Sequence, residues 1–327
     1  MKSTATANSN IAFIKYWGKA DDRLFLPMNS SLSMTLDGLQ AVTTVEFSED
    51  FHKDTAEING NPVNEKTFSR IARQLDLIRG IAKSKTKATV ASEINFPMAT
   101  GLASSAAASA SLTLAATSAL GLKLDAKRLS VLARQGSGSS CRSIYGGYVK
   151  WLKAGSSDGS YAVQVADENH LDIRDVIAIV SEEEKEVSSR DAMKITVETS
   201  PLYKARVDSV EKNIRSIEKA ILDKDFKAIG EIAEADCLSM HATMITSQPA
   251  LVYWQPATVK LMKEVVNWRN EGLDVYFTID AGPNVHILTL PETSKEVERR
   301  LKAMPEVKKV MQSKPGTGAK LLGRHIL

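Results

Sequence analysis

The sequence predicts an α+β protein built from two domains. Its 327 residues exceed the size at which one hydrophobic core usually stops growing. Strand and helix patterns follow one another without the regular alternation of a doubly wound parallel sheet. A second set of elements begins near residue 180, so we expect domains at 1–180 and 181–327.

The first half mixes strand patterns with amphipathic or alanine-rich helices. Strand patterns occur at 11–14, 40–47 and 88–97. Helical patterns occur at 65–83, 104–119 and 125–136. Gly121 ends the alanine-rich helix, and the next one has Asp125 as its N-cap and Gly136 at its end.

The second half opens with a strand pattern, DVIAIVS, typical of a buried strand. A long helical region over 200–245 is broken near 223–225. Residues 273–290 predict a strand pair interrupted by an Ala-Gly-Pro-Asn turn, and 294–304 predict an amphipathic helix.

Composition excludes several classes of protein. A net charge of +3, with Lys and Arg dispersed, argues against nucleic-acid binding and still suits a small anionic substrate. Cys141 and Cys237 are too few for a disulfide framework, and no Cys/His cluster has metal-ligand spacing. We expect no membrane span, no signal peptide and a cytoplasmic location.

The stretch 96–110, FPMATGLASSAAASA, enters the alanine-rich helix through small residues. The first N–H groups of such a helix are free, and small side chains let an anion approach them. The hydroxyls of Ser104 and Ser105 could also bind phosphate or Mg²⁺. The Gly-Lys-Ser/Thr ending of a Walker A loop is missing. Small residues also suit a helix that packs closely on a neighbour, and composition leaves both interpretations open.

A second motif, RQGSGSSCRSIYGGYVKW, covers 134–151. Ser137 and Ser139 stand before Arg142, between glycines that permit unusual backbone angles. Hydroxyl donors beside a guanidinium suit phosphate or carboxylate. The alternative is a helix end and flexible turn, with Arg142 in a surface ion pair.

A third motif, NSNIAFIKYWGKADD at 8–22, places Lys15, Tyr16, Trp17 and Lys19 after an apolar strand. Two ammonium groups and a phenol at a strand end could contact an anionic substrate. The alternative is a solvated strand end with an aromatic anchor.

The fourth motif, FTIDAGPNVHIL, sets Asp280 between a strand and a Gly-Pro turn. There its carboxylate could accept a proton from a hydroxyl. The alternative is an aspartate that caps its own turn.

Six stretches, taken in chain order, form a recognisable set. They are NIAFIKYWGK, NSSLSMTL, FPMATGLASSAAASA, GSGSSCRSIYGGYVKW, VSSRDAM and DAGPN, between residues 8 and 284. Together they resemble the mevalonate diphosphate decarboxylase family of the GHMP kinase superfamily. The glycine–serine stretch alone marks only the superfamily, whereas IKYWGK with GSGSSCRS and DAGPN is far more specific.

The resemblance implies a reaction that needs ATP and Mg²⁺. Mevalonate 5-diphosphate would be phosphorylated on its tertiary 3-hydroxyl and would then lose phosphate and CO₂ to give isopentenyl diphosphate. It also implies an N-terminal domain like ribosomal protein S5 domain 2, a ferredoxin-like C-terminal domain, an active site between them and a homodimer.

The resemblance also assigns residues by position. Asp280 matches the catalytic aspartate, Arg142 the arginine that orients the substrate carboxylate, and Ser188 a serine near the transferred phosphate. Lys15 belongs to the same signature, and Trp17 supports it. The groups expected to grip the diphosphate are Tyr16, Lys19, Ser137 and Ser139. The ATP phosphates would be held by Gly101, Leu102, Ala103, Ser104, Ser105 and Ala106, with Ser105 reaching the phosphates or the metal.

Two other functions are compatible with the sequence. One is a relative of the same fold that acts on mevalonate 5-phosphate, or that phosphorylates the 3-hydroxyl without decarboxylation. Asp280 together with Arg142 favours decarboxylation, and Lys19 with the two serines favours a diphosphate. The other rival is a metabolite-binding regulator without turnover.

Overall fold

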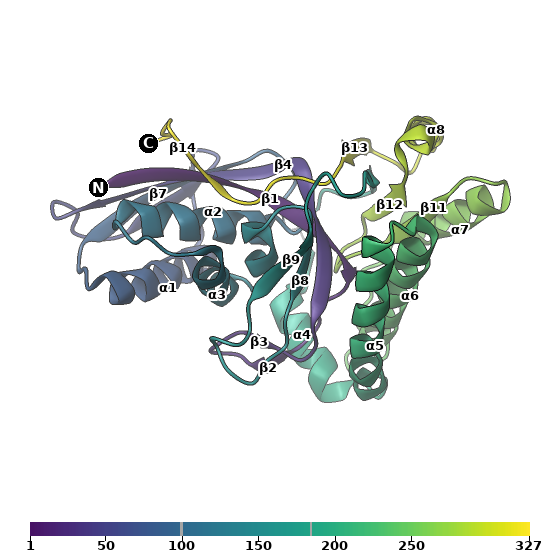
Figure 1. The fold of residues 1–327 in the computed structure, drawn as a ribbon, viewed down its shortest axis with the longest axis horizontal. Helices are drawn as coiled ribbons and strands as arrows, with labels where there is room; N and C mark the ends of the chain where they lie inside the picture. The colour runs from purple at the N-terminus through teal and green to yellow at the C-terminus, as the bar shows by residue number, and fades with distance from the viewer. Residues whose placement is uncertain (99–100, 184) are drawn as a thin grey trace.

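The computed structural model describes residues 1–327 except 99, 100 and 184. It is an α+β protein, as predicted, with two main sheets that lie toward opposite ends of the molecule (Figure 1). Within the described residues, no helix is long and apolar enough to cross a membrane. Positions 99 and 100 of the glycine–serine stretch lie outside the described residues.

The larger sheet holds strands from both ends of the chain. Its strands run in the order β14-β1-β4-β7-β5-β6, with β8 and β9 continuing from β4. All its pairings are antiparallel except that of β5 with β7. Its members are β1 Lys2–Ile14, β4 Ser31–Ser48, β5 Thr55–Ile58, β6 Asn61–Pro62, β7 Lys87–Ile94, β8 Tyr148–Trp151, β9 Ala162–Ala166 and β14 Lys320–Leu322. A short ribbon of β2 (Lys19–Asp21) and β3 (Leu26–Pro27) follows β1.

Three helices lie on one side of this sheet (Figure 1). They are α1 Glu65–Ala82, α2 Ser104–Ala119 and α3 Ala126–Gly136. The side chain of Asp125 caps α3 by accepting from the N–H of Arg128, as predicted. The small residues of α2 pack directly on β1 and β4, so close packing is one purpose of the alanine-rich helix.

The second sheet has the antiparallel order β11-β12-β10-β13. Its apolar side chains pack on α5 and α6 from one face and on α7 and α8 from the other. These strands are β10 Arg174–Ile179, β11 Val275–Thr278, β12 Val285–Thr289 and β13 Lys309–Ser313. The helices of this half are α4 Ser189–Thr199, α5 Tyr203–Leu222, α6 Phe226–Ile245, α7 Pro256–Asn270 and α8 Pro291–Lys302.

The two halves of the chain are joined more than once. β10 pairs within the second sheet, whereas β14 returns from the second half to pair with β1. Helix α6 also contacts β1. The division at 180 therefore stays a prediction, and the ends of β1 and β11 are brought close to one another.

Candidate active site

A buried ion pair joins the ends of two distant strands. Lys15 follows β1, Asp280 lies just beyond β11, and Lys15 Nζ is 2.7 Å from Asp280 Oδ1. The Lys15 side chain is 2% exposed and that of Asp280 is 22% exposed. Burial opposes ionisation of Asp280, but the nearby positive charges, of which Lys15 is the strongest, together hold the pKa of this carboxyl below its ordinary value. The site thus holds an ionised carboxylate that a ligand can reach, and Lys15 is not at a solvated strand end.

Arg142 is buried without a carboxylate partner among the described residues. It lies on the 3₁₀ helix η1, Gly138–Ile144, and is 2% exposed. Its guanidinium donates to Ser33 Oγ at 2.8 Å, Ser31 Oγ at 2.5 Å and Asn10 Oδ1 at 3.1 Å. The alternative of a surface ion pair is therefore wrong.

The environment of Arg142 favours an added anion. Burial lowers its pKa, and the charge of Asp280 opposes that effect. A guanidinium has five N–H donors, and three are used in these contacts. A buried cation held only by neutral groups is suited to receive a carboxylate or phosphate.

The loop that leads into α2 packs against the turn that carries Asp280. Its N-cap, Ala103, has a φ of 50° and no side-chain capping bond. Gly101 has a φ of 95°, and a Cβ there would lie 3.1 Å from the Cα of Gly282. Ser9 Oγ donates to the Leu102 carbonyl at 2.7 Å and holds the loop in place. The free N–H groups of this helix start therefore lie beside the aspartate turn.

Two of the expected phosphate-binding hydroxyls meet. Ser105 is exposed at the start of α2, and its Oγ lies 3.3 Å from the Oγ of Ser137. Ser139 is half-buried on η1, and its carbonyl accepts from Asn10 Nδ2 at 3.4 Å. Ser104 and Ala106 stand in the first turn of the same helix.

These residues fit a nucleotide triphosphate with its metal. Free helix N–H groups and exposed hydroxyls suit phosphate oxygens. Among the described residues, no group of three His, Cys, Asp or Glu could hold a metal by itself. Mg²⁺ needs few protein ligands when phosphates supply oxygens, so the Ser105 hydroxyl is a suitable contact.

The IKYWGK segment lines the same region. The Tyr16 ring packs on Trp151 with centroids 4.6 Å apart, and its hydroxyl is buried with no partner among the described residues. Burial raises the pKa of Tyr16, so this hydroxyl stays protonated. Trp17 packs in an apolar cluster with Tyr203, which is consistent with a supporting role. Lys19 pairs with Asp22.

Ser188 has a structural contact in this fold. It is the N-cap of α4, where its Oγ accepts from the N–H of Asp191 and donates to that carboxylate at 2.6 Å. The structure thus gives Ser188 a capping role, and its role near a phosphate stays a prediction.

Helix α6 supports both members of the ion pair. Asp236 Oδ2 accepts from the backbone N–H of Lys15 at 2.7 Å, and Asp236 is itself paired with buried Arg206. On the same helix, Cys237 Sγ accepts from the N–H of Ile279 at 3.1 Å. Consecutive residues of α6 thus hold the backbone that carries Lys15 and the backbone that carries Asp280.

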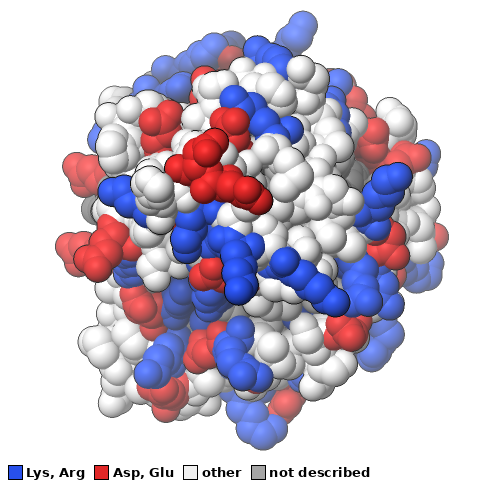
Figure 2. All heavy atoms as spheres, turned by 90° about the vertical axis from the view of Figure 1, so that its left-hand side faces the viewer, with Lys and Arg blue, Asp and Glu red and all other residues white. Residues whose placement is uncertain are grey.

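The structure adds cations that were not selected from sequence. Arg190 at the start of α4 and Arg73 of α1 both lie beside Phe25, as does Lys19. Arg190 stands inside the VSSRDAM stretch, two residues after Ser188, so its position was a usable signal. On the face shown in Figure 2, groups of Lys and Arg lie scattered among groups of Asp and Glu.

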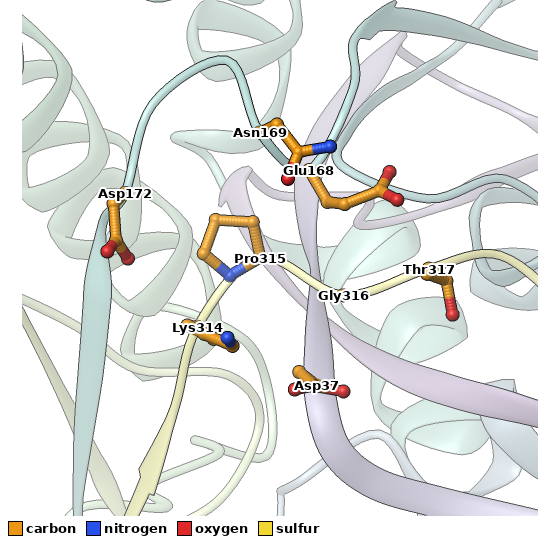
Figure 3. Close-up of a pocket in the computed structure, with 8 residues that line it drawn as sticks. All are labelled: Asp37, Glu168, Asn169, Asp172, Lys314, Pro315, Gly316 and Thr317. Atoms are coloured by element: carbon orange, nitrogen blue, oxygen red, sulfur yellow. The ribbon is translucent and has the colours of Figure 1, made fainter.

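A separate pocket lies away from these residues. It has a volume of about 410 Å³ and shares no lining residue with the ion pair, Arg142 or the α2 loop. Figure 3 shows its carboxylates Asp37, Glu168 and Asp172 around the chain from Lys314 to Thr317. The chemistry described above lies elsewhere.

The fold and this site define a class of protein that handles phosphate groups next to a buried acid–base pair. Residues 7–162 match the family model "Diphosphomevalonate decarboxylase-like N-terminal domain". Residues 175–321 match "Mevalonate 5-diphosphate decarboxylase C-terminal domain". The chain belongs to the diphosphomevalonate decarboxylase family.

Several named relatives are similar in sequence to this chain along most of their length. The diphosphomevalonate decarboxylase of Candida albicans is 40% identical over 301 residues, covering 87% of this chain and 83% of the relative. The human one is 39% identical over 315 residues, covering 90% and 78%.

Solved structures are similarly close. A structure described as MDDEF in complex with MVAPP, AMPPCP and magnesium has a TM-score of 0.93 and 42% identity, over 98% of this chain and 99% of that one. Mevalonate diphosphate decarboxylase from Staphylococcus aureus has a TM-score of 0.93 and 38% identity, over 98% of both chains.

Proposed function

We propose that this protein catalyses the ATP-dependent decarboxylation of mevalonate 5-diphosphate to isopentenyl diphosphate, with ADP, phosphate and CO₂ as the other products. The observation that carries the proposal is a buried guanidinium, Arg142, that has no carboxylate partner among the described residues and whose charge acts on the ionised Asp280. This arrangement supplies a place for a substrate carboxylate beside a base for a hydroxyl. Family membership and the MVAPP and AMPPCP complex of a relative support the same reaction.

Asp280 aligns the tertiary 3-hydroxyl and accepts its proton as that oxygen takes the terminal phosphoryl group of ATP. Lys15 keeps the carboxylate ionised before the transfer. A tertiary alcohol is a poor nucleophile, so alignment and proton removal lower the barrier. The new phosphate ester is then a good leaving group.

Arg142 holds the substrate carboxylate while the C–O bond breaks. The electrons of the C–C bond to the carboxylate form the new double bond, CO₂ departs, and phosphate leaves with the oxygen. The neutral cradle of Ser31, Ser33 and Asn10 fixes the direction of the guanidinium. Because the carboxylate loses its charge in this step, orientation matters more than strong charge pairing.

The N-terminus of α2 holds the nucleotide phosphates. Residues Gly101 to Ser105 offer backbone N–H groups, and Ser104 and Ser105 add hydroxyls, whereas the N–H of Ala106 already donates to the Ala103 carbonyl. Mg²⁺ bound with the nucleotide would neutralise phosphate charge. Ser105 contacts the phosphates or this metal, which its exposure and its approach to Ser137 support.

The diphosphate of the substrate is gripped by Tyr16, Lys19, Ser137 and Ser139. The buried Tyr16 hydroxyl, which has no partner among the described residues, supports this assignment. Trp17 supports the segment by packing, and Ser188 adds a hydroxyl near the phosphate.

The finer organisation is proposed on the family resemblance. The N-terminal domain, 1–180, is of the ribosomal protein S5 domain 2 type, and the C-terminal domain, 181–327, is ferredoxin-like. The protein acts as a cytoplasmic homodimer, and light scattering of the purified protein would measure its mass in solution.

The reaction is tested by mixing the purified protein with Mg-ATP and mevalonate 5-diphosphate while ADP and CO₂ are measured together. Equal release of both products is expected. ADP without CO₂ would identify a 3-kinase, and turnover only with mevalonate 5-phosphate would change the substrate. Binding of the diphosphate with no ADP release would favour the regulator.

A further inference from the structure

One aromatic ring is surrounded by cations from three elements. The ring of Phe25 lies 4.9 Å from Lys19 Nζ, 4.6 Å from the guanidinium carbon of Arg73 and 4.9 Å from that of Arg190. These cations belong to β2, α1 and α4. Phe25 is 3% exposed and sits just before β3. A ring face attracts cations, so one side chain gathers charges that otherwise repel.

The cluster has more positive charge than its carboxylates offset. Lys19 pairs with Asp22, and Arg73 donates to the Gln135 carbonyl. No ion pair of Arg190 is found among the described residues. Burial, together with the charges of other arginines nearby, lowers the pKa of Arg190. Such a cluster is stabilised when an anion joins it.

The backbone at Phe25 is in a costly conformation. Its φ is 55°, in the left-handed region that bulky residues seldom adopt. The surrounding structure therefore holds this ring in place against backbone strain. Strain of this kind is more often kept at ligand sites than in ordinary turns.

The cluster borders the proposed diphosphate grip. Lys19 follows the Tyr16 segment, Arg190 lies on the first turn of α4, and Arg73 contacts Gln135, two residues before Ser137. The positive charge of Arg190 also lowers the pKa of Tyr16, against the larger effect of burial.

We propose that Phe25 is a positioning residue that gathers Lys19, Arg73 and Arg190 into one clamp for the diphosphate of the substrate. This inference rests on the proposed function. A diphosphate carries more charge and more oxygens than a monophosphate, so a clamp of three cations favours the diphosphate. Phe25 itself touches no phosphate, and its effect passes through the cations.

The test replaces the ring and keeps its bulk. Phe25→Leu should weaken binding of inorganic pyrophosphate, measured by calorimetry, about five- to tenfold. The KM for mevalonate 5-diphosphate should rise by a similar factor, with kcat within about twofold. Phe25→Tyr retains the ring and should keep both the pyrophosphate affinity and the KM for mevalonate 5-diphosphate close to those of the wild type. Phe47→Leu, another buried phenylalanine on β4, is the matched control and should change neither.

A second pair of variants keeps the test valid if Phe25→Leu does not fold. Arg73 is exposed, so Arg73→Gln should fold and also weaken pyrophosphate binding about fivefold. Arg215→Gln removes an exposed charge of α5 as its control. Unchanged pyrophosphate binding in Phe25→Leu and Arg73→Gln would overturn the clamp. Pyrophosphate binding that depends on Phe25 in a protein without decarboxylase turnover would instead overturn only the proposed function.

Discussion

The buried position of His241 predicts that the folded protein loses stability in mild acid. This residue of α6 is 1% exposed, its ring lies 4.7 Å from that of Trp254, and its Nε2 is 3.4 Å from the Ile279 carbonyl. Burial, reinforced by the nearby Lys15 ammonium, lowers the pKa of His241 to about 3. In the unfolded chain the pKa of a histidine is about 6.5. The folded protein therefore keeps this ring neutral through the physiological range.

The sign of the effect follows from the two pKa values. As pH falls below about 6.5, the unfolded chain binds a proton that the folded protein does not take up until about pH 3. The contribution is fully present above pH 6.5 and is lost progressively as pH falls toward 3. Between pH 7.5 and pH 5 the loss from this one group amounts to about 2 kcal/mol.

The assay is urea unfolding, followed by tryptophan fluorescence, at pH 7.5 and pH 5. His241→Gln keeps an N–H donor near the Ile279 carbonyl but does not titrate. Its free energy of unfolding should fall about 2 kcal/mol less than that of the wild type between the two pH values. His52→Gln, at an exposed position, should behave like the wild type. An equal fall in the free energy of unfolding of the wild type and of His241→Gln would show that His241 does not cause the loss of stability.

Two substitutions test the ligand-binding parts of the site. Arg142→Lys removes the guanidinium fork that Ser31 and Ser33 orient. CO₂ release should therefore fall about 100-fold, and by a larger factor than ADP release. Equal losses of both products in a quenched-flow assay would argue against a role of Arg142 in the decarboxylation step. Gly101→Ala forces a Cβ against the turn that carries Asp280, so the KM for ATP should rise about tenfold. Gly60→Ala shares the positive φ in open space and is the matched control, and a similar KM for ATP in both variants would contradict the contact.

Local signals in the sequence predicted many of the elements. The Asp125 cap, the break between α5 and α6, and the β11–β12 pair all lie where they were expected. Helices α4 and α7 were not predicted, although Ser188 and Pro256 are start signals of known kinds. The first residues of β1 were missed because its buried side chains are largely polar. Thr4, for example, is buried against Thr44 through a hydroxyl pair at 2.7 Å.

The sequence also indicated candidate site residues, but it did not indicate which side chains they contact. Lys15 and Asp280 are 265 positions apart, and no local pattern reveals that their side chains meet. The neutral cradle of Arg142 depends equally on how β1 and β4 pair beside η1. Phe25 gave no signal, because cations from three separate elements surround it only after folding.

We propose that Asp280, kept ionised by Lys15, is the base for the hydroxyl that is phosphorylated. The most direct measurement compares ADP release by Asp280→Asn and the wild type in a single turnover with mevalonate 5-diphosphate, together with calorimetric binding of that substrate. We expect the rate of ADP release to fall at least 1000-fold, while the dissociation constant changes by less than about threefold. ADP release within about tenfold of the wild type would contradict the account, because the barrier would then not depend on this carboxylate.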